Sequence, residues 1–305
     1  MTPLFPATVW SPTALDLDTD VTQDEWQRHV VEIAALEQTV GVNPQGSAVS
    51  VAARLQTIED LVTILGGAQL INLRVVNGAT PASQIGITAD AIGIEGSLVT
   101  TLSVTADITV AGLNGLSTGS EAASTWYFVW VGYNPTTMQR GATLSTSATR
   151  AGLNLAHASF AGFIKWRRVG ARRNDGTSNL MRGMQVDRLF LYEEDIPGTT
   201  GIVSSGTSST GNNAVSAAGF IPTTSRLGRF HCALRGATTA VNLRLRPNGA
   251  PSYQTVTEVS VLAGDVSRAT VDIGLDSTQQ IQWTNSGAGV GSPTDIAVVG
   301  YWDGV

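Results

Sequence analysis

Residues 125–131 read Thr125-Trp126-Tyr127-Phe128-Val129-Trp130-Val131, the strongest β-strand signal in the chain. Aromatic and β-branched side chains favour extended backbone. Side chains alternate between the two faces of a strand. The aromatic residues at 126, 128 and 130 therefore share one face, and Tyr127, Val129 and Val131 share the other. Both faces are apolar, which is typical of a strand buried on both sides. This segment therefore predicts the centre of a layered β structure.

The same two-residue period extends over most of the chain after Gln69. Charged residues make up 14% of the sequence and there are 33 glycines, a composition that suits strands joined by tight turns. A segment rich in glycine, serine and threonine at 197–213 predicts a domain boundary near residue 200. We expect a β-rich middle domain at 67–200 and a β-sandwich or jelly roll at 201–305. The strands expected there are 229–234, 241–245, 256–262, 269–273, 280–283 and 296–302.

The first twenty residues have a different character. Three prolines forbid a continuous helix and favour extended backbone. Apolar residues lie between them, and exposed aromatic side chains on such an arm need a surface to contact. Two interpretations stay open: an arm that anchors the chain to a larger particle, or an arm that folds back on its own chain. The anchoring residues would be Leu4, Phe5, Val9 and Trp10.

Residues 21–66 carry a helical period. Thr22-Gln23-Asp24-Glu25 fits a capping box, and an apolar stripe at helical spacing follows it up to Gly41 and Pro44. Ser47 can cap a second helix that ends at Gly66-Gly67. The two helices predict a short stalk.

The second helix contains a heptad seam formed by Val51, Leu55, Ile58, Val62 and Leu65, spaced four, three, four and three residues apart. Leucine at one core position and isoleucine at the other favour trimers or tetramers over dimers. Two heptads are marginal alone, so the β-rich body must contribute to assembly. An intramolecular helical hairpin would use the same stripes and is the alternative. We expect a homotrimer.

Charge and composition exclude several classes of partner. The formal net charge of −6 argues against a general affinity for nucleic acid. No segment reaches the ~18 uninterrupted apolar residues of a membrane span, and the first ten residues lack the pattern of a secretory signal. The one cysteine, Cys232, cannot form an intrachain disulfide and is expected to be a small buried residue.

No pattern predicts catalysis, a cofactor or a metal site. Histidines occur only at 29, 157 and 231, and the sequence has no nucleophile elbow, phosphate loop or helical zinc motif. Because His231 and Cys232 are neighbours in one expected strand, their side chains point to opposite faces. The carboxylates Asp187, Glu193, Glu194 and Asp195 cluster at a strand end and could in principle cleave sugars as a pair. We expect them in a solvated loop and expect no enzyme.

Two surface features could contact a ligand. One is the basic segment Lys165, Arg167, Arg168, Arg172 and Arg173 around Trp166, which we expect to form ion pairs and a solvated face. The other is the set Trp283, Tyr301 and Trp302, whose aromatic rings could stack on sugars of a host glycan or serve in core packing.

Several short motifs occur along the chain's first two thirds: Ala35-Leu36-Glu37, Asn43-Pro44-Gln45-Gly46-Ser47, Val51-Ala52-Ala53-Arg54-Leu55, Gly112-Leu113-Asn114-Gly115-Leu116-Ser117-Thr118-Gly119 followed by Thr125-Trp126-Tyr127, Ser145-Thr146-Ser147-Ala148-Thr149, and Val169-Gly170-Ala171-Arg172-Arg173-Asn174-Asp175-Gly176. These motifs resemble those of tailed-bacteriophage fibre and other virion appendage proteins. Ser117 stands where that pattern usually has an aspartate.

The resemblance implies a structural protein of a phage virion, assembled in the host cytoplasm and bound to other tail, neck or head proteins. In this interpretation residues 1–20 anchor a trimeric fibre, 21–66 form its stalk, and the C-terminal sandwich is a tip that adheres to a glycan or protein of the host surface. The alternative is a capsid or neck adaptor or decoration protein without a receptor.

Overall fold

The computed structural model describes residues 69–196, 202–206, 212–235, 241–252, 254–259, 266–286 and 294–304, together with Gln27 and Val31. The chain divides into two compact units, Met1–Val62 and Thr63–Val305. Gln27 and Val31 are helical. The expected arm at 1–20, with Leu4, Phe5, Val9 and Trp10, lies outside the described residues. So does the heptad seam of Val51, Leu55, Ile58, Val62 and Leu65.

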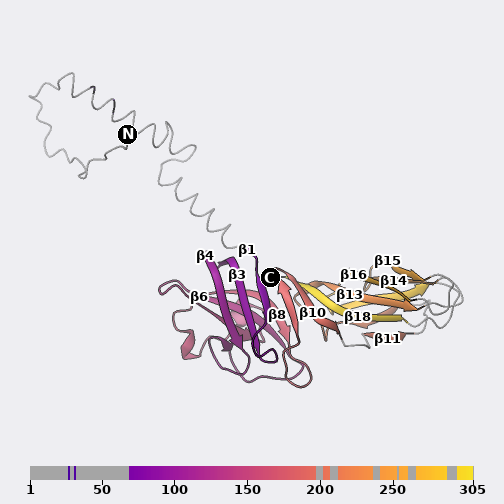
Figure 1. Cartoon of the computed structure of the whole chain (residues 1–305), viewed down its shortest axis with the longest axis horizontal. Coiled ribbons are helices and arrows are strands. Elements are labelled where there is room, and N and C mark those ends of the chain that lie inside the picture. The colour runs from indigo at the N-terminus through magenta and orange to yellow at the C-terminus, as the bar shows by residue number, and fades with distance from the viewer. Residues whose placement is uncertain are drawn as a thin grey trace, which may run out of the picture. The chain divides into compact units, whose positions relative to one another are not determined.

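The described part of the second unit is built from strands in three sheets (Figure 1). The largest sheet contains ten strands, β1 (Leu70–Ile71), β2 (Arg74–Asn77), β3 (Gln84–Ile94), β4 (Ser97–Asp107), β9 (Gly183–Val186), β10 (Leu189–Ile196), β11 (Val203–Gly206), β13 (Ser225–Arg235), β16 (Val266–Gly274) and β18 (Thr294–Asp303). A second sheet contains β5 (Gly115–Leu116), β6 (Trp126–Asn134), β7 (Gln139–Ser145) and β8 (Lys165–Arg173). The third contains β12 (Asn213–Ser216), β14 (Val241–Pro247), β15 (Gln254–Val259) and β17 (Gln280–Ser286).

The ten-stranded sheet has the order β1-β3-β2-β9-β10-β18-β13-β16, with β4 also paired to β3 and β11 to β18. One face of this sheet, its inner face, carries residues of two hydrophobic cores. In the first core, Ile85 and Ile87 of β3 pack with Val129 and Val131 of β6. In the second, strands β10, β13 and β18 pack with β14 and β17. The molecule is therefore mainly β, with two sandwiches that share one sheet.

Strand β6 confirms the expectation for residues 125–131. Tyr127, Val129 and Val131 lie in the first core, whereas Phe128 and Trp130 lie in a separate cluster on the other face of the same sheet. Two short 3-10 helices, η1 (Arg150–Gly152) and η2 (Ala158–Phe160), lie in the segment that completes this cluster, which includes Leu153 directly after η1 and Phe160 of η2. Apolar residues on both faces of β6 are thus explained by burial on both sides.

The β3–β4 hairpin departs from simple alternation in its middle. On β3 the residues that belong to the first core are at 85, 87 and 89 up to Asp90, and at 92 and 94 after it, where Ala91 and Gly93 are buried as well. On β4 they are 102 and 106 on one side of Thr101 and 99 on the other. Thr101 has a φ of 54°, which is unusual for a β-branched residue. Asp90 on β3 and Thr101 on β4 act as one extra residue on each strand. Because both strands gain one, the pairing of the flanking residues stays in register, but the side chains beyond this point turn to the opposite face.

The two sandwiches meet within the ten-stranded sheet. β10 pairs with β9 on one edge and with β18 on the other, while its Phe190 lies in the second core. The change from the first core to the second therefore occurs before the glycine-rich segment near residue 200. The last strand returns to this junction, where the Asp303 amide donates to the Arg188 carbonyl over 2.8 Å and Arg168 donates to the Gly304 carbonyl over 2.5 Å.

Three turns share the same hydrogen-bonded motif, an aspartate followed two residues later by threonine. In each, one carboxylate oxygen (Oδ1) accepts hydrogen bonds from the threonine amide and hydroxyl; the aspartates are Asp107, Asp175 and Asp276. Asp276 also accepts from the Gln280 amide over 2.8 Å and from the Asn248 side chain over 2.7 Å. Burial alone would raise the pKa of Asp276, but these hydrogen bonds outweigh it and lower the pKa to about 2.

Replacing Asp276 by alanine is expected to lower the free energy of unfolding by about 1–2 kcal/mol at neutral pH. The reason is that the Thr278 and Gln280 amides and the Asn248 side chain lose their hydrogen-bond acceptor. A carboxyl with a lowered pKa in the folded state stabilises the fold above the unfolded pKa, and this stabilisation is lost as the pH falls. The difference between wild type and Asp276→Ala should therefore shrink as the pH falls from about 4 to about 2. Urea unfolding followed by tryptophan fluorescence at several pH values measures it. Ser277→Ala, at the exposed neighbouring position, is the matched control, and a pH-independent difference would contradict the explanation.

Candidate functional site

The outer face of the ten-stranded sheet, the face turned away from both cores, carries an unusual row of apolar residues. Val186 pairs with Leu189, Leu189 with Trp302, and Trp302 with Leu227. Directly paired residues in an antiparallel sheet point to the same face. Their chain neighbours Gln185, Phe190 and Tyr301 are buried on the inner face, so the row lies on the outer one. It crosses four strands, β9, β10, β18 and β13.

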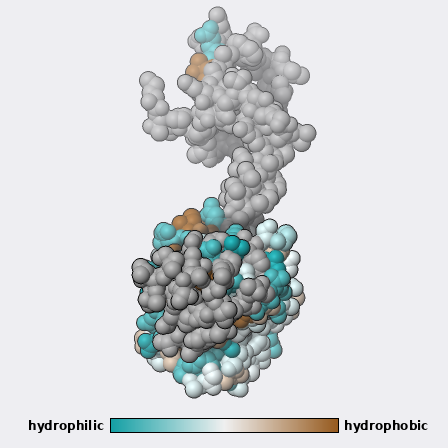
Figure 2. Space-filling model, turned by 90° about the vertical axis from the view of Figure 1, so that its right-hand side faces the viewer, coloured by the Kyte–Doolittle hydropathy of each residue, from teal (hydrophilic) through white to brown (hydrophobic). Residues whose placement is uncertain are grey.

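Further apolar side chains extend this surface. Ile71 pairs with Ala91, and Leu98 with Gly93; after the reversal at Asp90 these positions also face outward. Met184 lies two residues from Val186 on the same face. We call the set Ile71, Leu98, Met184, Val186, Leu189, Leu227 and Trp302 the outer apolar face. Apolar surface is visible in Figure 2 at the upper end of the body, where Figure 1 places β1, β3 and β4.

The exposure of this set is substantial. Five of its members are between 36% and 50% exposed, Trp302 being the least and Leu98 the most. They are half of the ten large apolar residues that are exposed among the described residues. A sixth, Val266, lies on the same face by register at the far end of β16. Single exposed apolar residues need no explanation, but the row Val186, Leu189, Trp302 and Leu227 is contiguous by strand pairing, and a contiguous apolar group marks a contact surface.

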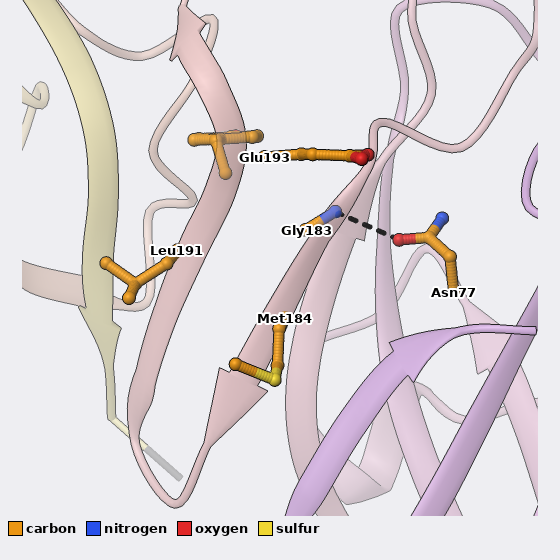
Figure 3. Close-up of a pocket in the computed structure, with 6 residues that line it drawn as sticks. Asn77, Gly183, Met184, Leu191 and Glu193 are labelled. Atoms are coloured by element: carbon orange, nitrogen blue, oxygen red, sulfur yellow. Dashed lines mark hydrogen bonds between the residues drawn. The ribbon is translucent and has the colours of Figure 1, made fainter.

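Two hollows open on this face. One, of about 410 Å³, is lined by Asn77, Gly183, Met184, Leu191, Tyr192 and Glu193. Figure 3 shows its Met184 and Leu191 on neighbouring strands, with the Gly183 amide donating to Asn77 Oδ1 over 2.9 Å. The other, of about 430 Å³, is lined by Asn72 and by residues of β2, β3 and β4, including Arg74, Asp90 and Thr101.

Trp302 lies next to a pair of charged side chains on this face. Arg229 donates two hydrogen bonds of 2.8 Å to the two carboxylate oxygens of Asp272, and its guanidinium lies 5.9 Å from the centre of the Trp302 ring. The hydrogen bonds from Arg229 lower the pKa of Asp272, and those bonds raise the pKa of Arg229 in turn. The two charged side chains beside Trp302 therefore form hydrogen bonds and an ion pair with each other.

The other two residues expected to contact a ligand are buried. Tyr301 is fully buried in the second core, where its hydroxyl donates to the Ala171 carbonyl over 3.0 Å. Trp283 is 6% exposed and belongs to the same core. Neither presents a ring face on which a sugar could stack, so core packing replaces the predicted ligand contact for these two. The alternation along β17 and β18 could not by itself tell which face was covered.

The basic segment lies on β8 and its side chains are used within the chain. Lys165 donates to Ser97 Oγ over 2.8 Å, and Arg167 donates to the Gln69 and Gly93 carbonyls over 3.0 and 2.7 Å. Arg168 lies 3.6 Å from Asp303, and the Arg173 guanidinium lies over the Phe220 ring. The Arg168–Asp303 contact is an ion pair of the expected kind, whereas Lys165 and Arg167 also hydrogen-bond neutral groups in place of a purely solvated face.

Arg172 is the exceptional member of this segment because it is fully buried. Its guanidinium donates to the Val75 carbonyl over 2.6 Å and to the Ala171 carbonyl over 2.9 Å, and it lies 4.3 Å from the centre of the Phe190 ring. Burial lowers its pKa. Val75 belongs to the first core and Phe190 to the second, so this one side chain joins the two sandwiches.

Three carboxylates of the acidic cluster, Asp187, Glu193 and Glu194, have different surroundings. Asp187 accepts from the Leu73 amide at a tight turn, and Glu193 lies 3.8 Å from Arg182 at the surface. Glu194 lines a different hollow from Glu193. Among the described residues no group of three or more His, Cys, Asp and Glu side chains could hold a metal ion.

Cys232 and His231 point to opposite faces of β13, as the sequence predicts. Cys232 is fully buried, and burial raises the pKa of its thiol to about 12. A thiol in this state is a poor nucleophile, because the thiolate is the reactive form. Across the described ranges, no helix combines the length and apolar character needed to cross a membrane.

The outer apolar face was not predicted from the sequence, although its members are visible there. Val186 belongs to β9, a short strand that has no expected counterpart. The signal that could have revealed the face lies in residues 189–192, where Leu189 and Leu191 on one side of the strand and Phe190 and Tyr192 on the other are all apolar or aromatic. A strand with two apolar faces needs two covered faces, and no element among the described residues covers the second face here.

Comparisons with known proteins give no family. No protein-family model matches the chain, and no curated protein matches it. Among solved structures, an exo-β-1,3-galactanase from Phanerochaete chrysosporium, with galactose, aligns at 11% identity and a TM-score of 0.21, covering 76% of this chain and 57% of its own. A structure of infectious bursal disease virus, Gx strain, aligns at 9% identity and a TM-score of 0.20, covering 78% and 69%. This chain thus spans little more than half of the galactanase, and similarities this weak carry no argument about fold or function.

Proposed function

We propose that this chain is a structural subunit of a phage virion appendage that assembles as a homotrimer. The observation that carries the proposal is the combination, in one chain, of an all-β body and a preceding heptad seam. Leu55 and Ile58 occupy core positions of that seam and favour a coiled coil of three or more helices. Because two heptads are marginal alone, the body must share in assembly.

The resemblance of several motifs to virion appendage proteins supports the virion as the setting. The role it implies for the C-terminal sandwich is adhesion to a host surface, without catalysis or a cofactor. Three copies of a weak binding site on one fibre, and several fibres on one particle, would strengthen binding through effective concentration. The return of β18 to the junction means that the adhesive part would not be the last residues of the chain.

The second candidate is a capsid or neck adaptor that binds only neighbouring virion proteins. Exposed apolar surface on the outer face of the large sheet favours burial against protein, which both candidates provide. Imaging separates them. Immunogold electron microscopy of intact virions, with an antibody raised against the C-terminal sandwich, should label projecting fibres if the chain is a fibre. Particles that label only after disruption would instead show an adaptor covered by its neighbours.

A further inference from the structure

We propose that the outer apolar face is the surface through which copies of this chain contact one another. The inference rests on the proposed trimer and adds which surface forms the contact. It assigns Ile71, Leu98, Met184, Val186, Leu189, Leu227 and Trp302 to the interface between subunits, in place of a sugar contact for Trp302.

The first argument is the extent of the face. The row Val186, Leu189, Trp302 and Leu227 runs without a break across strands of both sandwiches. Adjacent strands lie about 4.8 Å apart, so the row spans about 14 Å. Both four-stranded sheets pack on the opposite side of the large sheet. No described element covers this side. Exclusion of water from it by another protein surface would be favourable.

The second argument is the route of the chain, which favours a second copy as the occupant. Leu65, the last seam position, precedes Ile71 by six residues. At about 3.4 Å per residue these six residues span at most about 20 Å. Three chains joined at the seam must therefore hold their β1 strands within that distance of the bundle. Ile71 projects outward, because its neighbour Leu70 packs against the first core. In the proposed trimer the strand that carries Ile71 would thus lie within that reach of the sister chains' last seam positions.

The third argument concerns the chemistry around Trp302. A sugar site needs an open ring face and free hydrogen-bonding groups beside it. Here Leu189 and Leu227 flank the indole along the row, and the nearest charges, Arg229 and Asp272, hydrogen-bond each other. Arg229 also lies over the ring itself. Apolar neighbours and satisfied charges are characteristic of a protein contact, with charged residues at its rim.

The hollow beside Met184 and Leu191 fits the same interpretation. It is open at the surface and apolar side chains line its floor. In a threefold assembly each contact joins two different patches, so a projecting side chain of one subunit can enter a hollow of the next. An assembled face would thereby fill space that is empty in a single chain.

Single-cysteine labelling of the full-length chain tests the inference. Val186→Cys places a thiol on the outer apolar face, and Val110→Cys places one on an equally exposed valine away from it; the two valines are 43% and 49% exposed. Wild type is the blank, because its one thiol, Cys232, is buried. In a sample whose mass is that of a trimer, maleimide should label Val186→Cys at least tenfold more slowly than Val110→Cys. The same protection is expected for Ile71→Cys.

The outcomes separate the inference from the proposed function. Equal labelling rates in a sample of trimeric mass would overturn the inference, because the face would be open to another ligand such as a glycan, and would leave the trimer standing. A monomeric wild-type chain at micromolar concentration would overturn both. Near-ultraviolet circular dichroism matching wild type confirms that each cysteine variant is folded before labelling.

Discussion

Replacement of Arg172 by alanine is expected to destabilise the body more than any other single substitution considered for it. The guanidinium is fully buried and donates to the Val75 and Ala171 carbonyls. Its removal leaves a cavity and buried acceptors without donors, for an expected loss of about 3–5 kcal/mol. In a body of this size that corresponds to a fall in Tm of roughly 10 °C. Differential scanning calorimetry of the full chain measures it.

The matched control is Arg182→Ala. Arg182 is 64% exposed and lies 3.8 Å from Glu193, which is equally open to solvent. An ion pair of that kind contributes at most about 1 kcal/mol. If both substitutions lowered Tm by the same small amount, Arg172 would not be the link between the two sandwiches that its contacts indicate.

The second large effect is expected from the double substitution Leu55→Asp and Ile58→Asp. Aspartate at two adjacent core positions places like charges at the centre of a bundle, where they are desolvated and repel one another. We expect loss of the trimer at micromolar concentration, measured by light scattering after gel filtration. Glu59→Asp and Gln56→Asp, at positions of the same expected helix outside the seam, form the control pair. Unchanged oligomer size in the core variant would count against the seam.

The strands of the C-terminal sandwich could be located from the sequence because their alternation has a physical cause. Each expected segment from 229–234 to 296–302 overlaps an observed strand, since one apolar set faces the second core. Residues 125–131 were equally informative, because both faces of β6 are buried. Strand partners were not predictable in this way. The large sheet joins β9, β10 and β18 through pairing between distant segments, which a local period does not encode.

Two further features required the structure. The reversal at Asp90 and Thr101 moves the residues of the first core from odd to even positions on β3. A strict alternation continued past Asp90 therefore assigns these residues to the wrong face. The burial of Trp283 and Tyr301 depends on which sheet covers which face. A sequence shows that a side chain is apolar, but its exposure is decided by the element packed against it. The outer apolar face escaped prediction for the same reason.

The central claim, that three copies form the functional unit, is tested most directly by the mass of the full-length chain in solution. Light scattering of the purified protein at micromolar concentration should give about 95 kDa, three times the 31.8 kDa of one chain. A mass of about 32 kDa that persists at the highest concentration reached would contradict the account.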